Sequence, residues 1–265
     1  MLGKLLKYDY KANIFYFLLM YAVLMGAAVT ARLSIAAADM QYFSFSDDHV
    51  LSVMAMVGSV LFYFLICGAV AVLTLLLIAM RFYKNLMGNE GYLTFTLPVP
   101  KSSHLISKMI SGVSFVLLTY AALVLSAMVL TVGMDFWDSP VAVFSWSLLE
   151  AVRFDHPLIA SLYCLEGLVT VIQVVAVVYF SICVGQLAGK HRVLGAIGIY
   201  LAVNVVLGIV AALGSTIFIN LLRGYEGGVF YYGITSTATI LFHGVVAAGC
   251  LVGSFLLMKW KLNLE

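Results

Sequence analysis

Six long runs of apolar residues constrain this chain more than any other feature. They cover residues 14–37, 51–80, 107–132, 158–187, 194–219 and 237–258. Each is longer than the roughly 18 apolar residues that indicate a membrane-spanning helix. Apolar residues make up 64% of the 265 residues and charged residues only 10%, whereas an ordinary soluble domain is about 25% charged. The sequence therefore predicts an integral membrane protein with six transmembrane segments.

The six segments are predicted to be helices. Lipid offers no hydrogen bonds to the backbone, so a crossing segment must satisfy its own polar groups, as a helix does. The strands of a membrane barrel would alternate between apolar and polar residues, and these runs do not. The predicted class is all-α, and the absence of an internal repeat or low-complexity tract predicts one transmembrane domain over residues 1–265.

The positions of the basic residues predict the orientation in the membrane. If the amino terminus is cytoplasmic, eleven of the fourteen basic residues lie inside and three lie outside. The inner residues are Lys4, Lys7, Lys11, Arg81, Lys84, Lys101, Lys108, Lys190, Arg192, Lys259 and Lys261, and the outer ones are Arg32, Arg153 and Arg223. By the positive-inside rule, both termini are expected in the cytoplasm.

The amino terminus, LGKLLKYDYKANI, places its leucines on one helical face and its lysines on another. This pattern predicts an interfacial helix on the inner membrane surface before the first span; lysines that only set the orientation would be compatible with it. A cleavable signal peptide is the alternative. The apolar run from Ile14 to Ala31 is long for a signal core, and Arg32 separates it from the alanines at 36–38.

No residue pattern typical of a catalytic or metal site is present. The five histidines are separated, no HExxH motif occurs, and the four cysteines form no CxxC pair. The string GQLAGKH, from Gly185 to His191, has three residues between its glycines and histidine after its lysine. A phosphate-binding loop needs four residues and then serine or threonine. We therefore expect neither enzymatic activity nor ATP binding by this motif in the chain itself.

Four polar side chains within the apolar runs are the candidate pathway residues. They are Glu166, Gln173, Asn204 and His243. Polar and ionisable groups are expensive in lipid and usually face protein or water, which makes them functional hypotheses. Glu166 lies about 13 Å into the fourth span, and Gln173 is two turns further on nearly the same face. The alternative is that Glu166 lies near the outer interface, solvated or paired with Arg153 or Arg223.

Two GxxxG pairs are candidates for close helix packing. They consist of Gly185 with Gly189 and Gly249 with Gly253. Small residues at this spacing allow helix backbones to approach closely in a membrane.

The polar interruption after the second span carries a resemblance to a known family. The run GNEGYLTFTLPVPKSSHLISKMISG begins at Gly88 and resembles the cytoplasmic segment of permeases of type-2 ABC exporters, in which an acidic-Gly-Tyr-Leu-x-x-Thr-Leu-Pro pattern leads into the third span. The opening LLKYDYKAN is similar to their amino-terminal interfacial helix. Six spans, two cytoplasmic termini and a length of 265 residues extend the resemblance over the whole chain.

The resemblance implies a permease subunit in a bacterial cytoplasmic membrane, which exports its cargo by alternating access. It implies partners, namely two ABC ATPase subunits that bind ATP and Mg, and a second permease, identical or homologous. Lipids would surround it, and no nucleic acid or cofactor is expected on this chain. The cargo class would be a peptide, a lipid or an amphipathic drug.

The resemblance also implies a cytoplasmic coupling helix between spans two and three, which contacts the ATPase. Its residues here would be Asn89, Glu90, Gly91, Tyr92, Leu93 and Phe95. A short helix with aromatic and aliphatic anchors can fill a groove on a partner. The alternative is an ordinary interfacial turn in which Tyr92 and Phe95 anchor the chain to the membrane.

Two other functions remain open from the sequence. The chain could be a secondary transporter or channel that uses Glu166 as a proton or ion site, or a membrane scaffold that transports nothing. Co-purification of an ATPase in stoichiometric amounts would favour the exporter over both.

Overall fold

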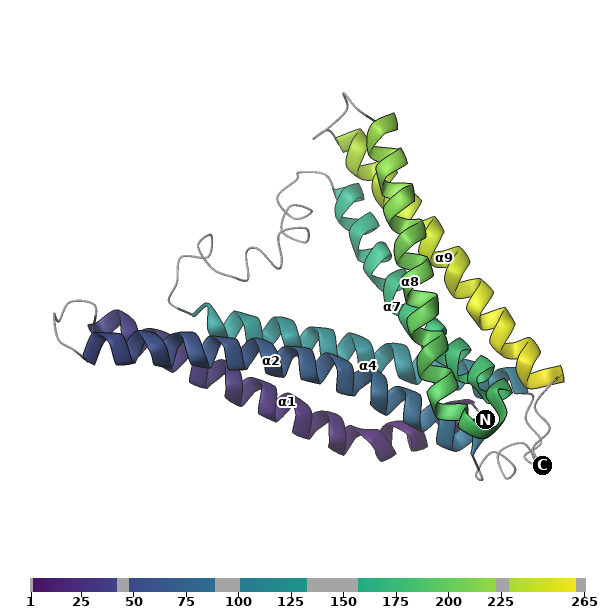
Figure 1. Ribbon diagram of the computed structural model, residues 1–265, viewed down its shortest axis with the longest axis horizontal. Coiled ribbons are helices and arrows are strands. Elements are labelled where there is room, and N and C mark those ends of the chain that lie inside the picture. Colours follow the sequence, from purple (N-terminus) through teal and green to yellow (C-terminus); the bar gives the residue numbers. More distant parts are fainter. Residues whose placement is uncertain (1, 42–47, 89–100, 133–156, 223–228, 261–265) are drawn as a thin grey trace. The chain divides into compact units, whose positions relative to one another are not determined.

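A computed structural model describes residues 2–41, 48–88, 101–132, 157–222 and 229–260, and within these ranges the chain is helical and contains no strand (Figure 1). The elements are α1 (Leu2–Gln41), α2 (Asp48–Phe82), the π-helix η1 (Tyr83–Met87), α4 (Lys101–Leu130), α7 (Pro157–Gly185), the 3-10 helix η3 (Gln186–His191), α8 (Arg192–Leu221) and α9 (Val229–Trp260). The coupling-helix residues, 89–95, lie outside the described ranges.

The predicted all-α class is confirmed for the described residues. Six of the helices are long and apolar enough to cross a membrane, and each contains most of one predicted span. Several helices extend past the apolar runs. In α9, which begins eight residues before the predicted span, the Thr235 hydroxyl hydrogen-bonds to the Tyr231 carbonyl at 3.0 Å. The helix thus begins before the predicted span, and the Thr235 hydroxyl is satisfied within its own helix.

The amino-terminal segment is helical and is continuous with the helix of the first span. α1 runs without interruption from Leu2 to Gln41, so the amphipathic residues and the first span form one helix. Its placement along the membrane surface remains a prediction.

The chain divides into two compact units. Unit 1 contains Met1–Leu6, Leu77–Val113 and Glu150–Glu265, and unit 2 contains Lys7–Leu76 and Ser114–Leu149. The boundary falls inside α1, α2 and α4, so these helices contribute residues to both units.

In unit 1, α7 is the central helix and packs against both α8 and α9. Near its carboxyl end, Tyr179 stacks on Phe82 with 4.0 Å between the ring centroids. The Tyr179 hydroxyl donates a hydrogen bond to the Lys108 carbonyl at 2.9 Å. Gly112 leaves the space for this ring, since a Cβ there would lie 2.7 Å from the tyrosine oxygen. The aromatic pair therefore joins α7 to the ends of α2 and α4 that belong to this unit.

In unit 2, hydroxyl groups join α1, α2 and α4. Thr119 of α4 lies 2.9 Å from the Tyr21 hydroxyl of α1 and 3.1 Å from the Thr74 hydroxyl of α2. In the middle of α2, the Tyr63 hydroxyl lies 3.0 Å from the Ser126 hydroxyl of α4. Interhelical hydrogen bonds of this kind stabilise packing in lipid, where apolar contact with a neighbouring helix has little advantage over contact with lipid.

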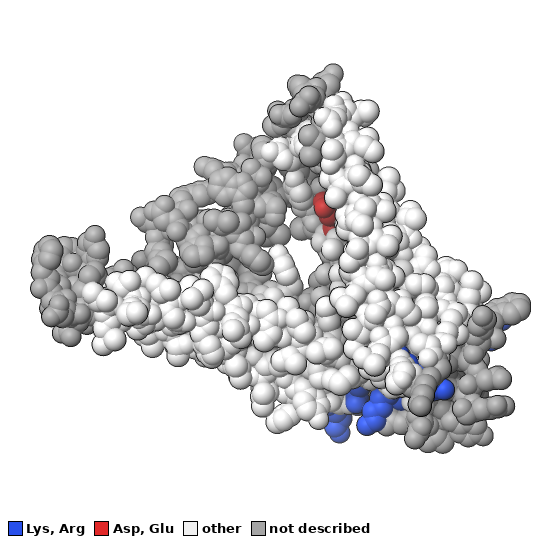
Figure 2. All heavy atoms as spheres, in the orientation of Figure 1, with Lys and Arg blue, Asp and Glu red and all other residues white. Residues whose placement is uncertain are grey.

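The distribution of charge agrees with membrane insertion. In the view of Figure 2, the helices are almost entirely white along their lengths, so they carry few charged side chains. Five basic residues of unit 1 lie at or near helix ends: Arg81, Lys84, Lys108, Arg192 and Lys259.

Candidate functional site

The first polar contact within the spans joins α7 to α9 through Glu166. The Ser236 hydroxyl donates a hydrogen bond to Glu166 Oε2 at 2.8 Å. Ser236 is 2% exposed, and Glu166 is half-buried between the helices. The carboxylate therefore has a protein partner inside a membrane-spanning pair of helices, as expected for an ionisable group in lipid.

The second polar contact joins the same helices through Gln173. Its Oε1 atom lies 2.7 Å from Nδ1 of His243. Because an amide oxygen only accepts, this hydrogen bond needs the imidazole proton on Nδ1. Gln173 is buried and His243 is half-buried. The contact thus joins α7 to α9 and orients the His243 ring.

The two contacts follow from the way α7 and α9 pack. The paired residues are 70 positions apart in both cases, and within each helix the polar residues are seven apart. Seven residues are close to two helical turns, or about 10.5 Å, so a constant offset means that the helices run parallel in register. We call Glu166, Gln173, Ser236 and His243 the α7–α9 polar seam.

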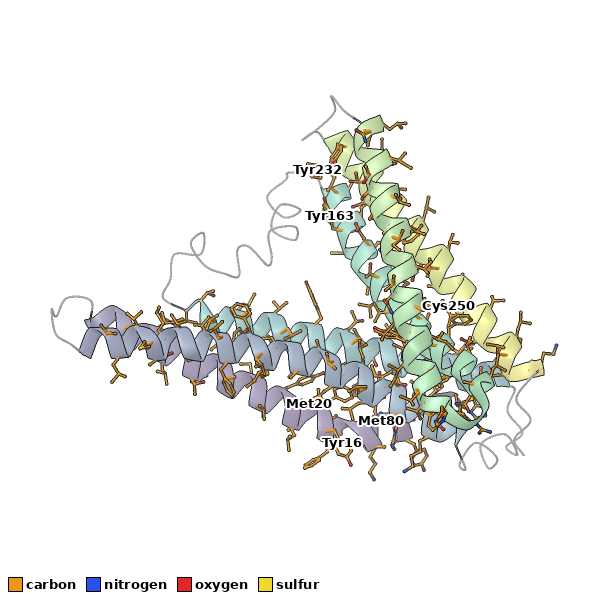
Figure 3. The ribbon with its side chains drawn as sticks, in the orientation of Figure 1. Tyr16, Met20, Met80, Tyr163, Tyr232 and Cys250 are labelled. Carbon is orange, nitrogen blue, oxygen red and sulfur yellow. The ribbon has the colours of Figure 1, made fainter. Side chains whose placement is uncertain are left out.

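The ends of the two helices confirm this register. In Figure 3, Tyr163 of α7 and Tyr232 of α9 lie at the same end of the pair. Between the two contacts, the Thr170 and Thr239 hydroxyls bond to carbonyls of their own helices at 2.9 Å. The seam therefore has two interhelical polar contacts separated by hydroxyls that are satisfied within each helix.

All four side chains of the seam can form hydrogen bonds, and the carboxyl and the imidazole can also carry a proton. The seam combines a carboxylate, an imidazole, an amide and a hydroxyl, which together offer both donors and acceptors. Among the described residues there is no group of three or more His, Cys, Asp or Glu side chains that could hold a metal ion. The seam can interact with a polar or cationic group, or with a proton.

The structure places Asn204 apart from the other three predicted pathway residues. Its side chain is exposed on α8, and its Nδ2 atom donates to the Tyr200 carbonyl of the same helix at 2.8 Å. Sequence alone could not separate Asn204 from the others, because each is a polar residue in an apolar run and only packing decides which face is covered.

Two of the four candidate packing glycines, Gly185 and Gly253, lie at close helix contacts in the described residues. A Cβ at Gly185 would lie 2.6 Å from the Ala196 backbone, so this glycine permits α7 and α8 to approach. A Cβ at Gly253 would lie 2.8 Å from the Phe180 ring of α7, whereas Gly249 has nothing within 4 Å. Gly189 lies in η3. One glycine of each pair thus has a packing role, in two different contacts.

Ser236 is the member of the candidate site that sequence reasoning missed. Serine is common in transmembrane helices, so its presence alone carries little information. The available signal was its spacing: it precedes His243 by seven residues, as Glu166 precedes Gln173. A search for equal spacing of polar residues in two apolar runs would have found it.

No protein-family model matches the chain, and no curated protein or solved structure matches it either.

Proposed function

We propose that this chain is the membrane-spanning permease subunit of a type-2 ABC exporter in a bacterial cytoplasmic membrane. The observation that carries the proposal is the sequence EGYLTFTLP, which follows the second span and is similar to the coupling segment of such permeases. The six apolar helices support the more general part of the proposal, that the chain is a multi-pass membrane protein. ATP and Mg would bind to separate ATPase subunits.

The α7–α9 polar seam supports a role in transport. Polar groups inside a membrane protein are retained where they face a pathway or form a relay. In this proposal, the half-buried members of the seam, Glu166 and His243, face the route of the cargo beside a second permease, and ATP binding at the partner changes the packing of the spans through residues 89–95.

The decisive experiment measures coupling between the permease and its ATPase. Leu93→Asp and Phe95→Asp place a charge on the proposed contact. We expect each to abolish cargo-stimulated ATP hydrolysis in reconstituted vesicles while the permease still elutes as a folded protein. Val99→Asp, between the two prolines of the same segment, is the matched control and is expected to retain coupling. Full coupling in both variants, or no ATPase that binds the chain, would refute the proposal.

A secondary transporter driven by protons or ions is the second candidate. The specific observation in its favour is the hydrogen bond between Ser236 and the Glu166 carboxylate inside the spans. Glu166→Gln keeps an acceptor for Ser236 but removes the charge. In vesicles without ATP, transport that follows a pH gradient and is lost in this variant would favour the second candidate over the exporter.

A further inference from the structure

Glu166 places a carboxylate among the spans of unit 1 without a basic partner in the described residues. It is the one acidic residue that the structure describes in this unit, and its side chain has one hydrogen bond within the described chain, from Ser236. Arg81 and Lys108 lie on the ends of α2 and α4 that meet Tyr179, about 20 Å further along α7. A bare carboxylate is costly among apolar helices, so a cation from outside the described chain would stabilise it.

The contact with Ser236 holds one oxygen of this carboxylate and leaves the other open. Oε2 accepts the hydrogen bond from Ser236, which is 2% exposed. Oε1 has no hydrogen-bond partner among the described residues, and it is not one of their enclosed polar atoms that lack one. Since Glu166 is half-buried, Oε1 lies at the surface of the α7–α9 pair. A ligand can therefore reach an acceptor that the protein already holds in place.

Two tyrosines flank this contact. Tyr163 precedes Glu166 by three residues on α7, and Tyr232 precedes Ser236 by four on α9. Residues at these spacings are neighbours on a helix surface. Both tyrosines are half-buried and lie at the same end of the pair in Figure 3. Side chains on a helix lean toward its amino terminus, so the carboxylate leans toward the turn of Tyr163. The face of an aromatic ring attracts a cation, as the carboxylate does.

We propose that the Glu166 end of the α7–α9 polar seam binds an organic ammonium group, which pairs with Glu166 Oε1 beside the rings of Tyr163 and Tyr232. An ammonium N–H donates a charge-assisted hydrogen bond to a carboxylate oxygen, and the aromatic rings attract the same charge. The identity of the ligand rests on the proposed function: if the chain is a permease, its cargo carries an amine.

A metal ion fits this end of the seam less well than an ammonium group. Calcium takes about six to eight oxygen ligands, and magnesium demands a near-ideal octahedron. Glu166 is a single carboxylate, and the described residues contain no group of three or more His, Cys, Asp or Glu side chains that could hold a metal. A proton would neutralise Glu166 without any ligand, and the experiment separates that case.

The test measures binding of radiolabelled hexylamine to the full chain in a neutral detergent, by equilibrium dialysis against detergent alone. Hexanol and hexanoate carry the same alkyl chain with a neutral or a negative head. We expect hexylamine to bind and to raise the midpoint of thermal unfolding, and the other two to do neither at the same concentration. This comparison needs no variant, so it decides the matter even if a variant fails to fold.

Two sites of substitution then locate the bound amine. Glu166→Gln keeps an oxygen for Ser236 but removes the charge, and it should weaken hexylamine binding by about tenfold or more. Tyr163→Leu removes a ring and should weaken binding about threefold, whereas Tyr163→Phe, its matched control, keeps the ring and should bind like the parent. The midpoint of each variant without ligand shows whether it is folded.

The outcomes separate the site, its source of amine and the proposed function. Equal binding of all three compounds, or a Glu166→Gln chain that binds hexylamine like the parent, would overturn the proposal. Absence of hexylamine binding would also overturn it and leave Glu166 to a proton. Displacement of hexylamine by lysophosphatidylethanolamine but not by lysophosphatidylglycerol would assign the site to a lipid headgroup, and displacement by neither would assign it to a soluble amine. Co-purification of an ATPase tests the exporter function alone, and its failure would leave the ammonium site standing.

Discussion

α7 and α8 are neighbouring helices with the same mean hydropathy in their most apolar stretches, yet half of that stretch is buried in α7 and none of it in α8. α7 packs on two helices and carries Glu166 and Gln173 into contacts with α9. α8 packs on α7 and η3, and its polar residue Asn204 is exposed. Hydropathy therefore predicts that a segment enters the membrane, but it does not predict what the segment touches there.

The contact between the two helices is where the largest effect is expected. Gly185→Leu would force a side chain into the Ala196 backbone, since even a Cβ would lie 2.6 Å from it. Overpacking of this kind costs about 3 kcal/mol, and we expect much less folded protein after purification and a lower midpoint of thermal unfolding in detergent. Gly249→Ala, at a site with nothing within 4 Å, is the control. A Gly185→Leu chain as stable as this control would show that α7 and α8 do not meet here.

The next largest loss of stability is expected in the α7–α9 polar seam, which involves the more buried helix, α7. Gln173→Leu leaves His243 without its partner at 2.7 Å. A polar group that loses its partner in a buried site costs about 2 kcal/mol. In a double-mutant cycle, Gln173→Leu combined with His243→Leu should be less destabilising than the sum of the two single changes. Additive effects on the thermal midpoint would mean that the two side chains do not interact.

A smaller effect is expected at Ser236, whose hydroxyl is one donor to the Glu166 carboxylate. Ser236→Ala should cost about 1 kcal/mol and should act through Glu166. In a Glu166→Leu background, we therefore expect the same serine change to have little effect on thermal stability. An equal loss in both backgrounds would place the role of Ser236 elsewhere.

The last comparison makes one substitution on both helices, and its exposed half, at Val206, has the smallest expected effect of all. Val175 of α7 is fully buried, while Val206 of α8 is 58% exposed. Removing the methyl groups of Val175 creates a cavity and should cost about 1.5 kcal/mol. Val206→Ala should change stability by less than about 0.5 kcal/mol, because lipid contacts alanine nearly as well as valine. Equal losses of stability would show that α8 is as closely packed as α7.

The sequence predicted the spans well, and the reason is physical. Runs such as 158–187 and 194–219 are too apolar for water, and in lipid the backbone must form a helix. Both helices formed within a few residues of these bounds, as α7 and α8. Helix ends were less predictable, since α9 begins at Val229, before the predicted span at 237–258.

The candidate site was predicted in part. Glu166, Gln173 and His243 were identifiable because each is polar in an apolar run. Their partners were not, since a hydrogen bond between residues 70 positions apart depends on how two helices pack. The same holds for unit 2, where Thr119 meets Tyr21 and Thr74 from two other helices.

By itself, the sequence determined that the described residues form helices and that six of these are long and apolar enough to cross a membrane, because composition and run length decide whether a segment can remain in water. Only the tertiary structure decided that Gln173 bonds to His243 while Asn204 is exposed. The physical reason is that lipid is as apolar as the side chains it surrounds. The choice between lipid and a neighbouring helix therefore depends on close packing and polar partners, which become visible when the helices are placed side by side.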